Sequence, residues 1–217
     1  MTNGKRKPSS DLPVSKGCKP RGMPAVQPGR IGILGGAFNP LHNGHLIICE
    51  WICEDFSLNK IIFVPTYLPP HKETSIPFRL RYQMVERGIR GNKKFALTDL
   101  EKNLFGPSYT IKTIHRLKEQ LPGANFFLII GSDQFREITT WFKPAAIMNE
   151  CQVIVVKRPG YEISKRASFY REVLIARAPT LEISSSQIRK RVRDGLSIRY
   201  LVPPAVEDFI RHHRLYR

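Results

Sequence analysis

Two histidines stand three positions apart shortly after a pair of glycines, in the most informative stretch of the chain. The segment runs from Gly35 and Gly36 through Pro40 to His42 and His45. Glycines let a ligand approach the backbone, and proline stiffens the turn. A helix that begins here offers free N–H groups, and two imidazoles could hydrogen-bond an anion or, when protonated, neutralise it. These residue types in this order predict a phosphate-binding turn.

The turn differs from two common nucleotide-binding motifs, because it lacks the lysine of a Walker A loop and the spacing of the Gly-x-Gly-x-x-Gly fingerprint. A zinc site on one helical face, from His45, Cys49 and Cys53, is also disfavoured. At about 1.5 Å rise per residue the first and last of these lie roughly 12 Å apart along the axis. We interpret both cysteines as core residues and assign no metal to protein side chains.

A second candidate for phosphate binding lies near the C-terminus, in the run Ser184, Ser185 and Ser186 followed by Ile188 and Arg189. Serines ahead of an apolar periodicity indicate a helix N-cap, and a capped N-terminus again offers N–H donors to an anion. By itself the segment is more typical of serines that only cap a helix and of a solvated arginine than of a phosphate site.

Five short apolar runs are typical of strands that are buried on both faces. They cover residues 31–34, 61–64, 95–97, 126–130 and 153–156. Helical stretches separate them, so right-handed crossovers would join them into a mostly parallel sheet with ligands at the carboxyl ends of its strands. We therefore predict an α/β, Rossmann-like, doubly wound fold with a C-terminal helical segment.

Apolar residues at helical spacing mark the predicted helices. Ile48, Trp51, Ile52 and Phe56 form one such set between the first two strands. Similar patterns predict helices over residues 111–121, from the serine run to about residue 195, and from about residue 204 onward.

Composition bounds the class of protein. The chain has 217 residues, of which 41% are hydrophobic and 24% charged, which indicates one folded domain rather than a disordered chain. No apolar run approaches the roughly 18 residues of a membrane span. Four cysteines do not make a disulfide framework, so a cytoplasmic location is expected. Residues 1–30 hold five prolines and seven basic residues against one acidic, and we expect a disordered tail there, with the catalytic domain over 31–217.

A net charge of +17 favours anionic partners without naming one. Nucleic acid, phosphorylated metabolites and an anionic membrane surface all remain open on charge alone.

The glycine–histidine turn resembles the Gly-Gly-x-Phe-x-Pro-x-His-x-Gly-His signature of the nucleotidylyltransferase superfamily. Ala37 and Asn39 stand where that family commonly has threonine or serine and aspartate. The serine run resembles the family's second motif, Ser-Ser/Thr-x-x-Ile-Arg. The resemblance implies that His42, His45 and Arg189 are catalytic. It also implies an ATP and phosphate site formed by Gly35, Gly36, Ala37, Phe38, Ser184, Ser185, Ser186 and Ile188.

Polar segments in the middle of the chain narrow the acceptor, since each stands at a predicted strand end or helix start. They are residues 66–72, 108–110, 131–133, 140–142 and 157–160. In this order they resemble the bacterial nicotinate-nucleotide adenylyltransferases, over Ile31 to the closing Leu215-Tyr216-Arg217. The resemblance implies a nicotinate mononucleotide site formed by Tyr67, His71, Lys72, Tyr109, Thr110, Asp133, Trp141 and Arg158.

The chemistry of these residue types agrees with that site. Trp141 could stack on an electron-poor pyridinium, and Thr110 with nearby N–H groups could receive a carboxylate. Asp133 could accept ribose hydroxyls, while Lys72 and Arg158 could reach a phosphate. Each residue also has an ordinary reading as a core aromatic, a helix cap or a solvated charge.

The reaction implied by the resemblance is adenylyl transfer from ATP to nicotinate mononucleotide, which gives nicotinate adenine dinucleotide and pyrophosphate in NAD biosynthesis. Mg²⁺ would act on the ATP phosphates. The alternatives are another nucleotidylyltransferase, with nicotinamide mononucleotide or phosphopantetheine as acceptor, and a basic nucleic-acid-binding protein. The predicted enzyme requires neither nucleic acid nor a membrane, and the sequence leaves the oligomeric state open, a homo-oligomer included.

Overall fold

The structure is a computed structural model that describes Met1, residues 29–69 and residues 75–217. Most of the predicted tail, together with His71 and Lys72, lies outside the described residues. Within those residues no helix has the length and apolar character needed to cross a bilayer.

A six-stranded parallel sheet forms the centre of the molecule, in the order β3-β2-β1-β4-β5-β6. Its strands are β1 (Arg30–Gly36), β2 (Lys60–Pro65), β3 (Phe95–Leu97), β4 (Asn125–Gly131), β5 (Gln152–Val156) and β6 (Val173–Ile175). The five predicted strands and their parallel arrangement are confirmed. The sequence did not indicate β6, a three-residue edge strand in which only Val173 is buried.

Helices cover both faces of this sheet. Cores formed with α1 (Asn43–Asp55) and α2 (Phe78–Gly88) lie on one face, and the core formed with α3 (Thr110–Gln120) and α5 (Pro144–Glu150) lies on the other. The chain winds outward from β1 to β3 and then returns to β4 on the other side of β1. The order therefore reverses between β1 and β4, which is the place where doubly wound sheets bind ligands.

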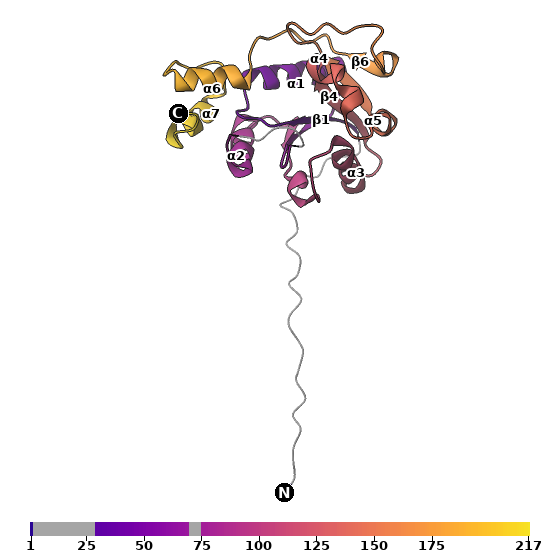
Figure 1. Cartoon of the computed structure of the whole chain (residues 1–217), viewed down its shortest axis with the longest axis horizontal. Coiled ribbons are helices and arrows are strands. Elements are labelled where there is room, and N and C mark those ends of the chain that lie inside the picture. The colour runs from indigo at the N-terminus through magenta and orange to yellow at the C-terminus, as the bar shows by residue number, and fades with distance from the viewer. Residues whose placement is uncertain (2–28, 70–74) are drawn as a thin grey trace.

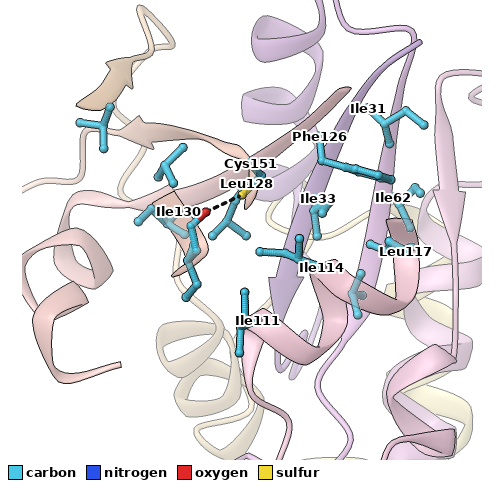
Figure 2. Close-up of a cluster of buried hydrophobic side chains, with 14 of the residues drawn as sticks. Ile31, Ile33, Ile62, Ile111, Ile114, Leu117, Phe126, Leu128, Ile130 and Cys151 are labelled. Atoms are coloured by element: carbon cyan, nitrogen blue, oxygen red, sulfur yellow. Dashed lines mark hydrogen bonds between the residues drawn. The ribbon is translucent and has the colours of Figure 1, made fainter. Parts of the chain in front are cut away.

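Strand residues alternate between the two cores, as a pleated strand requires. On the α3 side, apolar residues of the helix pack against the sheet, and Figure 2 shows Ile111, Ile114 and Leu117 facing the strands near Ile33 and Ile62. All five are at most 3% exposed. Full burial of side chains of this size contributes about 1.5–3 kcal/mol each, which fixes α3 and its N-terminus relative to the strand ends.

The C-terminal helices α6 (Ser185–Arg193) and α7 (Pro204–His212) lie at one end of the molecule, near the start of α1 and against α2 (Figure 1). A third core joins Met84 of α2, Ile188 of α6 and Phe209 of α7. Short helical turns complete the structure: η1 (Leu100–Asn103), α4 (Ser132–Arg136), η2 (Ile138–Thr140) and η3 (Tyr170–Glu172).

Helix α1 confirms the interpretation of the cysteines but corrects its apolar face. Cys49, Ile52 and Cys53 are at most 2% exposed, whereas Trp51 is 48% exposed and points away from the core. Burial raises the pKa of the Cys53 thiol to about 11, so this side chain behaves as a small neutral apolar group. Ile48, Ile52 and Phe56 pack in the α1-side core as predicted, so Trp51 is the one residue of the predicted apolar face that is wrong.

Candidate active site

Two adjoining cavities open where the strand order reverses. The α3-side cavity has a volume of about 520 Å³, and its lining includes Gly35, Ala37, Thr66, Thr110, Trp141 and Arg189. The α1-side cavity has a volume of about 440 Å³, and its lining includes His42, His45, Arg158, Tyr161, Ser184 and Gln187. The loop 35–45 and the N-terminus of α6 contribute residues to both cavities, so the two meet there.

The loop after β1 presents backbone to the α3-side cavity. Open space lies where a Cβ of Gly35 would stand, so a ligand can approach the main chain there. Phe38, by contrast, is 3% exposed, and its ring packs against those of His45 and Phe63 at centroid distances of 5.2 and 5.7 Å. Any phosphate contact of Phe38 must therefore come from its backbone. Its φ of 46° turns the chain toward α1.

His42 and His45 lie at the N-terminus of α1 with their rings stacked, the centroids 3.6 Å apart. The backbone N–H of His42 donates to Nδ1 of His45 over 3.3 Å. Because Nδ1 accepts this bond, the proton of a neutral His45 resides on Nε2. That N–H is available as a donor to a ligand in the α1-side cavity.

Burial keeps both imidazoles neutral before a ligand binds. Desolvation, with a smaller contribution from Arg158, lowers the pKa of His42 to about 3. Desolvation holds the pKa of His45 well below its usual 6.5, with smaller contributions from His42 and, smallest, from Arg158. Protonated imidazoles are therefore not available in the free protein near neutral pH. The pair acts as hydrogen-bonding groups, and a bound phosphate would raise both pKa values.

The N-terminus of α6 carries the predicted serine cap. Ser184 Oγ accepts a hydrogen bond from the Gln187 N–H over 3.2 Å, which confirms the N-cap. Ser185 Oγ donates to the Pro40 carbonyl over 2.8 Å and so ties α6 to the loop after β1, 145 positions away in the chain. The two predicted phosphate motifs therefore lie next to each other and are joined by a hydrogen bond.

Arg189 is held at the junction of the two motifs. Its Nη1 donates to the Asn39 carbonyl over 2.8 Å, and its Nη2 donates to Ser186 Oγ over 3.1 Å. The partly buried guanidinium lines the α3-side cavity with donors to spare. Such a rigidly held fork suits a phosphate.

The side chain of Ile188, which the second motif assigned to the ATP and phosphate site, lines neither cavity. Its side chain is fully buried in the core shared with α2 and α7, and its N–H donates to the Ser184 carbonyl over 3.0 Å. Ile188 therefore anchors α6 beneath the site.

Aromatic residues and a helix N-terminus form the far wall of the α3-side cavity. Trp141 is partly buried there, and Phe142 stacks on Tyr109 with centroids 4.6 Å apart. Thr110 is the first residue of α3. The first N–H groups of a helix have no intrahelical partner, so this wall combines a flat aromatic surface with donors suited to a carboxylate.

Residues 33–191 match the family model described as cytidylyltransferase-like. A protein of Geotalea uraniireducens named as a nicotinate-nucleotide adenylyltransferase is 42% identical over 212 residues, covering 86% of this chain and 98% of that protein. A protein of the same designation from Rubrobacter xylanophilus is 36% identical, covering 87% of this chain and 92% of that protein. This chain belongs to the nicotinate-nucleotide adenylyltransferase family.

A solved structure supports the fold of this adenylyltransferase. The nicotinic acid mononucleotide adenylyltransferase of Plasmodium falciparum, complexed with NaAD, superposes with a TM-score of 0.75 at 24% identity, covering 87% of this chain and 97% of that one. The predicted Rossmann-like fold is confirmed. Adenylyl transfer in NAD biosynthesis, which the resemblance of the phosphate motifs and of the polar segments in the middle of the chain implied, is confirmed as the activity for which the family is named.

Arg158 and Asp133 of the adenylyltransferase, predicted to form one mononucleotide site with Trp141, lie apart from that residue. Arg158 lines the α1-side cavity with the histidines, and its Nη1 lies 3.3 Å from Asp133 Oδ2. Val156 faces the α1-side core, and side-chain alternation carries Arg158, two residues on, to the same side. The pair is therefore not brought together with Trp141. Its close packing leaves no room for a Cβ at Gly131.

The ring of Tyr67, predicted for the mononucleotide site, does not line the α3-side cavity. It packs edge-on against Phe78 with centroids 5.2 Å apart, and the Tyr67 N–H donates to Glu101 Oε2 over 3.1 Å. Glu101 Oε1 accepts from Thr113 Oγ over 2.8 Å. The buried Glu101, which sequence reasoning missed, therefore fixes both the loop after β2 and the first turns of α3 behind the α3-side cavity.

Arg81 of α2 is a second residue that the sequence did not reveal. It is 0% exposed, and it donates to the Ala37 and Thr66 carbonyls over 2.8 Å each and to the Ile76 carbonyl over 3.4 Å. One guanidinium thus joins the loops that follow β1 and β2. The signal was hidden because a charged residue at a buried position interrupts the apolar period of α2, which was not predicted either.

Proposed function

We propose that the α1-side cavity receives ATP and the α3-side cavity receives nicotinate mononucleotide. The observation that carries this division is that both cavities meet at the loop 35–45 and at the N-terminus of α6. A dinucleotide laid across the junction would have its phosphates beside His45 and Arg189. The aromatic wall with the α3 N-terminus suits a pyridine ring with a carboxylate, which assigns the α3 side to the mononucleotide.

The reaction needs no protein nucleophile. An oxygen of the 5′-phosphate of the mononucleotide attacks the α-phosphorus of ATP, a new P–O bond forms, and the bond between the α-phosphorus and the bridging oxygen breaks to release pyrophosphate. The protein must bring two polyanions together and stabilise charge on the departing group. His45 Nε2–H, the Arg189 fork and two helix N-termini supply donors that are in place before the reaction begins.

The residues around the junction fit a Mg²⁺ ion held mainly by the ATP phosphates. Among the described residues there is no group of three or more His, Cys, Asp or Glu side chains placed to hold a metal. Mg²⁺ usually keeps several waters and binds substrate phosphates with few protein ligands. When bound, it would neutralise charge on the triphosphate.

This division changes the roles proposed for two residues. Arg158 belongs with ATP, because it lines the same cavity as His42 and His45, and Asp133 is assigned with it through their ion pair. His71 and Lys72 lie outside the described residues and stay predictions for the mononucleotide phosphate, as do Thr110 and Trp141 for the nicotinate ring.

The proposed acceptor is tested by pyrophosphate release from ATP and Mg²⁺ with nicotinate mononucleotide, nicotinamide mononucleotide and phosphopantetheine in parallel. We expect nicotinate mononucleotide to exceed its amide analogue at least about a hundredfold in kcat/KM, because an amide NH₂ would meet N–H donors that a carboxylate satisfies. Equal efficiency with both would overturn the acid-specific site.

A Trp141→Ala variant provides the matched test of location. It should raise KM for nicotinate mononucleotide and leave KM for ATP within about twofold, since the ring lines the α3-side cavity and not the α1-side cavity. The reverse pattern would exchange the two cavities. Duplex DNA binding that falls steeply with salt, in a protein without turnover, would favour the nucleic-acid alternative.

A further inference from the structure

Asn39, in the loop after β1, has three of its four polar groups engaged by distant parts of the chain. Its Oδ1 lies 2.6 Å from the Tyr216 hydroxyl, its Nδ2 lies 2.9 Å from Ser75 Oγ, and its carbonyl accepts from Arg189 Nη1 over 2.8 Å. The residue is 7% exposed. Asn39 therefore joins the loop 35–45 to Tyr216 and to Arg189, the arginine at the junction of the two cavities.

The distances indicate which atom donates in each bond. A separation of 2.6 Å is typical of O–H···O and short for N–H···O, whereas 2.9 Å is typical of an amide N–H donor. Tyr216 thus donates its hydroxyl proton to Oδ1 of Asn39, and Nδ2 of Asn39 donates to Ser75. Burial raises the pKa of the Tyr216 hydroxyl, against smaller opposing contributions from Arg189 and Arg81, so the donor keeps its proton.

The end of the chain is held firmly enough to direct this hydroxyl. Leu215 is 8% exposed in the core formed with α7, and its N–H donates to the Ile210 carbonyl over 3.0 Å. Tyr216 follows with a φ of 65°, in the left-handed region that non-glycine residues rarely adopt. Such a conformation persists only where its surroundings determine it. Burial of Leu215 and the hydrogen bond to Asn39 hold Tyr216 in this conformation.

We propose that Tyr216 is a positioning residue of the adenylyl-transfer site, whose hydroxyl holds Asn39 so that the Asn39 carbonyl orients Arg189 toward the ATP phosphates. This inference rests on the proposed assignment of Arg189 to phosphate. Tyr216 itself does not line either cavity. Its effect on turnover passes through Asn39, which distinguishes it from a residue that only packs against the core.

The test is a double-mutant cycle with Tyr216→Phe and Asn39→Ala in the full-length protein. Phenylalanine keeps the ring and removes only the hydroxyl. Loss of one neutral hydrogen bond should lower kcat/KM for ATP about 3- to 10-fold, with little change in KM for the mononucleotide. In the Asn39→Ala background the same change should have an effect below about twofold, because the acceptor is gone. Tyr200→Phe, at an 83% exposed tyrosine, is the matched control.

ATP affinity, measured calorimetrically without an acceptor, provides a second readout. It should weaken in Tyr216→Phe by a similar factor and is independent of which acceptor the enzyme uses. Turnover with an unexpected acceptor would therefore count against the proposed function alone, because weaker ATP binding in Tyr216→Phe would still support this proposal. An effect of Tyr216→Phe below twofold on both kcat/KM and ATP affinity, or an equal effect in both backgrounds, overturns it.

Discussion

His45 offers the sharpest test of the phosphate site, because three substitutions separate its two roles. Its Nδ1 accepts the His42 N–H at the start of α1, and its Nε2–H faces the α1-side cavity. Alanine removes both functions. Glutamine at this third helical position can cap the helix and still carry N–H donors, and glutamate can cap the helix but offers only acceptors to a phosphate.

The expected magnitudes follow from these roles. Removal of a preorganised donor to a developing charge costs about 2.7–4 kcal/mol, so His45→Ala should lower kcat/KM about 10²- to 10³-fold. The lost cap bond and the lost contacts with the rings of His42 and Phe38 should also destabilise the fold by about 1–3 kcal/mol. For a domain of this size that lowers Tm by roughly 2–12 °C.

Pyrophosphate release at 25 °C, combined with thermal unfolding, distinguishes the two effects. His45→Gln should retain Tm within a few degrees and lose about tenfold in kcat/KM, which corresponds to about 1.4 kcal/mol. His45→Glu should also retain Tm but lose at least as much activity as His45→Ala. The exposed His115, changed to alanine, is the matched control and should change neither. A His45→Glu enzyme with near wild-type turnover would refute the donor role.

Two further predictions concern the charge and protonation of the site. Lysine in Arg189→Lys keeps the charge but cannot donate to the Asn39 carbonyl and to a phosphate at once, so kcat/KM for ATP should fall about 10- to 100-fold. The control Arg193→Lys, at an exposed position of the same helix, should change kcat/KM little. A selective rise in KM for the mononucleotide in Arg189→Lys would contradict this prediction. Unfolded histidine titrates near 6.5 and folded His42 near 3, so its contribution to stability is complete above pH 6.5 and is lost as pH falls, by about 2 kcal/mol between pH 7 and pH 5. His42→Asn should remove that share of the pH dependence in urea titrations, and an unchanged slope would show that the imidazole is protonated in the folded protein.

The sequence predicted the sheet well because each of its main strands is a continuous apolar run that needs no context to be recognised. Edge strand β6 and helix α2 were not predicted, for two different reasons. Strand β6 is as short as β3, but the described residues between β5 and β6 hold no α-helix, so the alternation of strands and helices did not mark it. The helix has its period interrupted by a buried arginine whose partners are backbone carbonyls far away in the sequence.

The predicted site residues divide in the same way. The histidines after β1 and the serines before α6 lie at helix N-termini as predicted, because the signals for a helix start are local in the sequence. Placement of Arg158 required knowing which face of the sheet its strand directs it to, and the role of Ile188 required knowing what covers α6. Both depend on packing between segments distant in the chain, which a list of motifs in sequence order does not contain.

Polar side chains that the protein buries gather behind the two ligand loops. His42, Arg81 and Glu101 are all at most 7% exposed, although such residues usually lie in water. Burying them costs free energy unless their bonds are made, and two of them make those bonds to the backbone of loops that line the α3-side cavity. Buried polar residues of this kind, which stabilise segments that line a cavity, are expected at functional sites. Buried polar groups therefore help to hold the loop 35–45 in place, and burial of His42 and His45 keeps their imidazoles neutral in the free protein.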